Sequence, residues 1–226
     1  MLFEIHLALG VISVFLSFIL VLLFFRVYRL QRSLYLLGMP IGFLFLTLSY
    51  FFLLMHFLYS NIAISASVMW IRVIAQTWGF TLIAASYYLS KRTKKITKFS
   101  IFDLSAWSVV SLICVFGLLI ILNPVIVLNS VYVDNRLFTA ANLVLLTYIF
   151  LFLLRNLESI KIMVKGMVFA PLVFALLWLG QFCFLIWDID RSSVALLGSQ
   201  VAPVIGLTIF LLLYYFVGKE PKMIGG

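Results

Sequence analysis

The sequence predicts an all-α protein, a single-domain bundle of seven membrane-spanning helices over residues 1–226. The composition is 65% hydrophobic and 10% charged, with a mean hydropathy of +1.25, whereas a soluble domain has about 25% charged residues. Seven apolar runs approach the roughly 20 residues that cross a hydrocarbon core. Backbone polar groups in lipid need internal partners, so these runs predict helices.

The expected spans are 5–25, 34–58, 67–89, 102–122, 137–154, 166–187 and 193–217. The first run lacks a basic leader and a cleavage site, and Arg26 and Arg29 follow it, so we expect a retained helix, not a signal peptide. The longest connection, 123–136, has β-branched runs around Asn129-Ser130. It predicts either a small hairpin or an irregular loop.

The charges predict the orientation of the bundle. Most lysines and arginines fall in the connections 26–33, 90–99 and 155–165 and in the tail after 217. The other side holds Glu4, Asp134, Asp188 and Asp190. The positive-inside rule then places the N-terminus outside and the C-terminus in the cytoplasm. The net charge of +9 therefore indicates contact with a lipid bilayer, not with nucleic acid, and the basic, loop-poor design suits a prokaryotic plasma membrane.

An internal repeat of a 3+1+3 type is a further expectation, with parallel repeats at 1–99 and 130–226. A shift of 127 residues aligns Gly79 with Gly206 and Ala75 with Ala202, and a shift of 128 aligns Gly38 with Gly166. Chance similarity between apolar segments is the alternative explanation.

Small residues recur at every fourth position in the third and seventh expected spans. Such stripes let helix backbones approach closely in lipid. We therefore expect both helices at the centre of the bundle, packed through Ala75, Gly79, Gly198, Ala202 and Gly206.

Polar residues that lie at a single depth in the outer half form the candidate ligand-binding site. Side chains at this depth are costly unless they face protein or water. One hypothesis is a ligand-binding layer in which Arg72 contacts an anion or a carboxylate. The alternative is that Arg72 snorkels and pairs with Asp188 or Asp190, while the amides bridge helices. The candidate residues are Arg72, Gln76, His56, Asn142, Gln181, Ser199, Gln200 and Asp188.

Catalytic and metal-binding motifs are absent from the sequence. No G-x-S-x-G or H-E-x-x-H pattern occurs, and His6 and His56 are the only histidines. Cys114 and Cys183 lack the spacing of a zinc site. We therefore expect a protein that is not an enzyme and that holds no metal ion.

The topology and a few residues resemble the microbial rhodopsins. Arg72 in the third span, Pro171 in the sixth and the segment 201–210 occupy places typical of that family. Pro203 stands where that family has its retinal lysine, and no expected span has a lysine in its core. The resemblance thus implies a rhodopsin-shaped fold without retinal or another cofactor, as in seven-helix sensor modules of prokaryotic signalling proteins.

The 3+1+3 plan also resembles the SWEET-type sugar carriers, which have prolines in the first two helices of each unit. This chain has Pro40 and Pro171 but no proline in the first or fifth span. The leading hypothesis is a receptor or sensor that binds a small ligand or a membrane protein, and that signals to a cytoplasmic partner. The alternatives are an accessory subunit of a membrane complex and a small-solute transporter.

Overall fold

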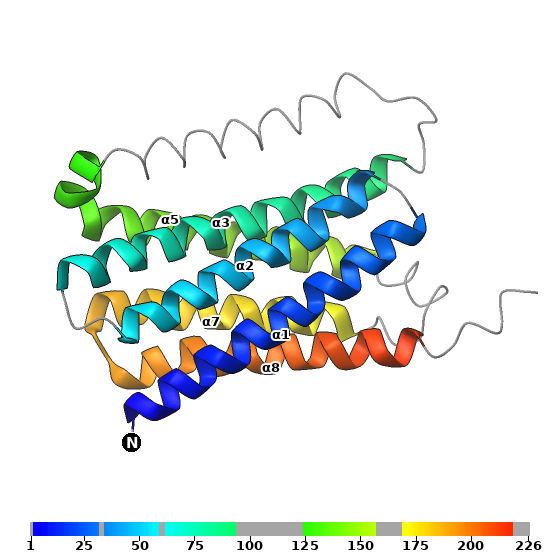
Figure 1. Ribbon diagram of the computed structural model, residues 1–226. Helices are drawn as coiled ribbons and strands as arrows, with labels where there is room; N and C mark the ends of the chain where they lie inside the picture. Colours follow the sequence, from blue (N-terminus) through cyan, green and yellow to red (C-terminus); the bar gives the residue numbers. More distant parts are fainter. Residues whose placement is uncertain (1, 32–33, 59–61, 94–123, 157–168, 219–226) are drawn as a thin grey trace, which may run out of the picture.

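The computed structural model describes residues 2–31, 34–58, 62–93, 124–156 and 169–218. This part of the chain forms helices that are each long and apolar enough to cross a membrane (Figure 1). The span expected at 102–122 lies outside the described residues. The helices are α1 (Leu2–Gln31), α2 (Leu34–Leu58), α3 (Ile62–Thr93), α5 (Pro124–Arg155), α7 (Ala170–Asp190) and α8 (Ser193–Gly218).

The helices form a closed ring. Each packs against the next in the order α1, α2, α3, α5, α7 and α8, and α8 packs back against α1. The end of the bundle where α1 begins and α7 ends is on the left in Figure 1 and is called the Asp188 end. The end where α8 finishes is called the Tyr214 end.

The connection expected at 123–136 is wrong, because α5 is helical from Pro124 onward. Proline suits the first turn of a helix, where its missing N–H costs no hydrogen bond. The β-branched residues that suggested a hairpin disfavour a helix by only about 0.7 kcal/mol or less each, so they do not prevent it. α1 also extends to Gln31, which places Arg26 and Arg29 on the helix instead of in a connection.

Helix α7 begins next to a proline. Pro171 lies in its first turn, where proline is tolerated.

Between α7 and α8 the chain reverses in a very short turn. Arg191 ends the helix in a left-handed conformation, with φ at 54°, and its N–H donates to the carbonyl of Trp187 at 2.8 Å. α8 then begins at Ser193, so the two helices are held antiparallel and adjacent.

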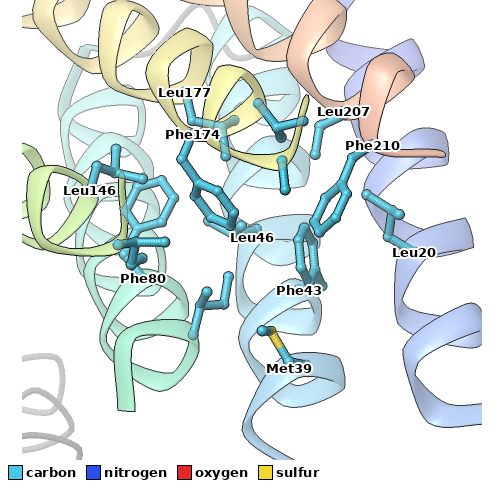
Figure 2. Close-up of a cluster of buried hydrophobic side chains, with 14 of the residues drawn as sticks. Leu20, Met39, Phe43, Leu46, Phe80, Leu146, Phe174, Leu177, Leu207 and Phe210 are labelled. Carbon is cyan, nitrogen blue, oxygen red and sulfur yellow. The ribbon is translucent and has the colours of Figure 1, made fainter. Parts of the chain in front are cut away.

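An apolar core fills the interior toward the Tyr214 end. Its aromatic rings converge from different helices, with ring centroids 5.7 Å apart between Phe43 and Phe210 and 6.0 Å apart between Phe174 and Phe210 (Figure 2). All six helices contribute to it, through Leu20, Phe43, Leu46, Phe80, Ile83, Leu146, Ile149, Phe174, Leu177, Leu207 and Phe210.

Glycines set the close contacts of two helix pairs. A Cβ on Gly79 of α3 would lie 2.9 Å from the carbonyl oxygen of Gly42 on α2, and a Cβ on Gly206 of α8 would lie 3.2 Å from that of Val173 on α7. The backbones therefore approach as small-residue stripes allow. Of the other expected packing residues, Gly198 lies against Cys183, and Ala75 and Ala202 are buried.

The helices differ in how far they are enclosed. In the span of α3, 83% of the residues are buried, against 39% in α8 and 22% in α1. Among the described helices α3 is thus the most enclosed, whereas α8 is no more enclosed than α7, also at 39%.

The order of buried and exposed positions is shared between helices that are distant in sequence. Residues 10–26 of α1 and 139–155 of α5 agree at every position except Phe24 and Leu153. Residues 39–58 of α2 and 170–189 of α7 agree at all but four positions, in a register that pairs Pro40 with Pro171. Each buried position of α8 from Ser199 to Phe210 also has a buried counterpart in α3, in the register that pairs Arg72 with Ser199 and Ile83 with Phe210.

Candidate functional site: a buried polar layer

Polar side chains replace the apolar core toward the Asp188 end of the interior. They continue the inner stripes of the six helices and are buried, with Asp188 at 7% exposure and Asn142 at 0%. We call this set the polar layer. It comprises His6, Ser13, Tyr50, Arg72, Gln76, Thr139, Asn142, Gln181, Asp188, Ser199 and Gln200.

Arg72 of α3 is the most unusual member of the layer, because this charged residue is only 2% exposed. Nη1 donates to Sδ of Met69 at 3.2 Å, and Cζ lies 4.1 Å from the centroid of the Phe184 ring on α7. Nε has no hydrogen-bond partner. Arg72 is thus buried against a thioether and an aromatic face.

The alternative in which Arg72 pairs with Asp188 or Asp190 is wrong. Asp188 instead accepts from Nε of Arg136 at 3.3 Å and lies 3.5 Å from Nη2 of Arg191. Both of these arginines are about half exposed, so they reach the carboxylate without being buried. A snorkelling Arg72 would have to extend past this cluster, and its low exposure shows that it does not.

Arg191 and Arg72 are connected by a column of aromatic rings on α7. Cζ of Arg191 lies 4.7 Å from the ring centroid of Trp187, and that ring lies 5.3 Å from the ring of Phe184. Phe184 then contacts Arg72. Cations over aromatic faces are stabilised by the ring quadrupole, which explains how a guanidinium is tolerated here.

Two pairs of polar side chains cross between helices in the layer. Nδ1 of His6 and Oε1 of Gln200 are 2.8 Å apart and join α1 to α8. With Gln200 in this orientation, His6 donates the hydrogen bond. Nδ2 of Asn142 donates to Oε1 of Gln181 at 3.4 Å and joins α5 to α7.

Several buried polar atoms of the layer and its neighbours have no hydrogen-bond partner among the described residues. Leaving one such atom unsatisfied costs about 1–3 kcal/mol. Their concentration indicates that water or a ligand supplies the partners. The atoms include both donors and acceptors, which suits the binding of a small polar molecule. They are Nε of Arg72, Oε1 of Gln76, Oδ1 of Asn142, Nε2 of Gln200, the Tyr50 hydroxyl and Nε1 of Trp70.

The remaining candidate residues lie in or beside the layer. His56 is half-buried next to Phe57, whose ring stacks on His6 with centroids 5.3 Å apart. The hydroxyl of Ser199 donates to the carbonyl of Leu196 within α8. Among the described residues, no three His, Cys, Asp or Glu side chains form a group that could hold a metal ion.

The sequence interpretation missed His6, Tyr50 and Phe184. A signal for His6 was present, because His6, Gly10, Ser13, Ser17 and Leu20 recur at helical spacing and mark the inner stripe of α1. No comparable pattern distinguishes Tyr50 or Phe184 from the other aromatic residues of α2 and α7.

Comparisons with known proteins add no assignment. No protein-family model matches the chain, and searches of curated proteins and of solved structures found no significant match.

Proposed function

We propose that the chain is a non-catalytic seven-helix membrane receptor or sensor that binds a small ligand in the polar layer. The observation that carries this proposal is the concentration of buried, unpartnered polar atoms at one end of the interior. Such groups are expensive in a membrane protein and mark functional sites. A ligand that satisfies them would be bound between all six described helices.

The orientation follows from the distribution of basic residues. Arg26 and Arg155 are exposed on α1 and α5 toward the Tyr214 end, whereas the buried carboxylate of Asp188 lies at the other end. The positive-inside rule supports a cytoplasmic Tyr214 end and places the polar layer in the outer half of the membrane. The layer is then within reach of molecules outside the cell.

The apolar core favours a receptor over an open transport path. Phe43, Phe174 and Phe210 fill the interior below the layer, so a ligand would be held there without passage. Binding would be relayed through α7 and α8, which are in close contact where Pro203 faces Gly180, 2.6 Å from the position of a Cβ. A separate cytoplasmic partner would read the resulting shift.

A duplicated three-helix unit would explain the shared order of exposed positions in α1 and α5, α2 and α7, and α3 and α8. The register that matches α2 to α7 pairs Gly42 with Val173 and Leu46 with Leu177, and a second register, which matches α3 to α8, pairs Gly79 with Gly206. Gly206 contacts Val173 and Leu177 as Gly79 contacts Gly42 and Leu46.

In these registers, polar-layer positions carry different side chains, since Arg72 pairs with Ser199 and Tyr50 with Gln181. Phe43 and Phe174 in the apolar core are identical. A duplicated scaffold with these differences would give its two halves unlike polar groups at the proposed ligand site.

A duplication of this kind would also favour a second candidate, a small-solute carrier of the 3+1+3 type. Such carriers bind near the interface of their repeats and open alternately to each side. This candidate requires the apolar core to separate, and it predicts saturable solute flux into liposomes.

The first test is gentle extraction followed by native mass spectrometry of the intact assembly. A retained small molecule that is lost in Arg72→Ala and Gln200→Ala, but kept in the control Arg155→Ala, supports the receptor. Stoichiometric partner subunits with no effect of either substitution would instead identify an accessory subunit. Unchanged ligand and partner interactions in both variants would refute the proposal.

A further inference from the structure

We infer that the ligand of the polar layer is a small monocarboxylate, whose two oxygens bind the Nε–Nη2 edge of Arg72. This inference rests on the proposed function and names the chemical class of the ligand. Three observations lead to it: the charge of the layer, the free edge of the guanidinium and the apolar residues around it.

The described part of the interior carries an uncompensated positive charge. Asp188 is the one carboxylate among the buried residues, and it is shared between Arg136 and Arg191. Glu4 and Asp190 are exposed. A buried charge without a counter-ion is strongly unfavourable, and an anion beside Arg72 would remove this cost.

The contacts of Arg72 leave one edge of its guanidinium free. Nη1 is used by Met69, one face is covered by Phe184, and Nε has no partner. Nε and Nη2 together present two parallel N–H groups. This spacing matches the two oxygens of a carboxylate, whereas a spherical halide has a single centre.

The residues around Arg72 favour a single charge and an apolar remainder. Met69 and Phe184 belong to a buried cluster with Leu53 and Val73. A second carboxylate on the ligand would lie against these apolar side chains with no cation to pair with it, which is unfavourable. An alkyl or aryl group would contact them favourably, by about 25 cal/mol per Å² of apolar surface that is removed from water.

The test uses the purified full chain in lipid nanodiscs at constant ionic strength. Sodium chloride is replaced stepwise by sodium formate, acetate, propionate or benzoate, and the unfolding temperature is followed. We expect a saturable rise, because a ligand that binds only the folded state stabilises it. Direct binding of radiolabelled propionate supplies a second readout that does not depend on stability.

Three variants make the outcome specific. Arg72→Gln keeps a polar side chain without the charge and should weaken propionate binding about tenfold or more, as expected for hydrogen bonds to a charged group. Arg72→Lys restores the charge without the paired donors and should recover only part of the affinity. Arg26→Gln, at an exposed position on α1, should bind as the unaltered chain does.

Chloride that stabilises as strongly as acetate, or Arg72→Gln that binds propionate normally, would overturn the inference. These results leave the proposed function intact if a neutral molecule is retained and Gln200→Ala releases it. If no carboxylate binds and Gln200→Ala changes no retained ligand, both the inference and the proposed function fail.

Discussion

The contact between Gly79 and Gly42 gives a prediction whose size can be worked from the structure. In Gly79→Ala, the new Cβ would lie 2.9 Å from the carbonyl oxygen of Gly42 and 2.9 Å from Cγ of Leu46. Both distances are shorter than real Cβ atoms show, and one partner is backbone, so α2 and α3 must separate. Overpacking of this kind costs about 1–3 kcal/mol.

A matched control has the opposite sign. In Gly10→Ala, the new Cβ would lie 3.2 Å from Cδ1 of Leu54, which is the end of a flexible side chain. Alanine is also a better helix former than glycine, by about 1 kcal/mol. This gain should make Gly10→Ala neutral or stabilising, whereas in Gly79→Ala it is set against an overpacking cost of about 1–3 kcal/mol, so we expect a net loss of up to about 2 kcal/mol.

The assay is thermal unfolding of both variants in one detergent, followed by circular dichroism. For a chain of this length, each kcal/mol shifts the midpoint by about 2–4 °C. Gly79→Ala should therefore unfold at least several degrees below Gly10→Ala. A Gly79→Ala variant that unfolds at or above the temperature of the unaltered chain would refute the reasoning, because the backbones would not be in contact.

Three further predictions concern other parts of the fold. Phe174→Ala removes a fully buried ring and should cost about 3–5 kcal/mol, while Phe15→Ala, at a site 65% exposed, should leave the unfolding midpoint nearly unchanged. His6→Phe should lower the free energy of unfolding by about 1 kcal/mol, because it removes the hydrogen bond to Gln200. In this variant a further Gln200→Leu substitution should be less destabilising than Gln200→Leu alone. Additive losses in the double variant would contradict a direct pairing. Asp188→Asn should lower the free energy of unfolding by no more than about 1 kcal/mol, because its partners Arg136 and Arg191 are half exposed. The difference in stability between this variant and the unaltered chain should shrink in high salt. A loss of stability that does not depend on salt would contradict this explanation.

The lengths of the apolar helices were the part of the fold that the sequence predicted best. Helices α2 and α8 begin and end within a residue of the expected positions, because lipid demands long uninterrupted apolar runs. The N-terminal extension of α5 was missed, since polar and β-branched residues around Asn129 are typical of connections as well as of helices. The expected span at 102–122 stays a prediction.

The sequence predicted the depth of the candidate site residues in the membrane but not which side chains pair with one another. Arg72, Gln76 and Gln200 were identified because polar groups inside apolar spans are rare. Their partners depend on which helices are neighbours, and hydropathy does not determine that. His6 lies beside Gln200 because α8 packs against α1. Arg136 pairs with Asp188 because α5 packs against α7.

The closure of the ring also sets an order for biogenesis. α1 is the first helix to be synthesised and α8 the last of those described, yet His6 bonds to Gln200 and the Tyr214 hydroxyl donates to the carbonyl of Leu23 at 3.4 Å. Until α8 is inserted, His6 therefore lacks its hydrogen bond to Gln200. The contacts between α1 and α8 therefore form only after the four described helices between them have been synthesised.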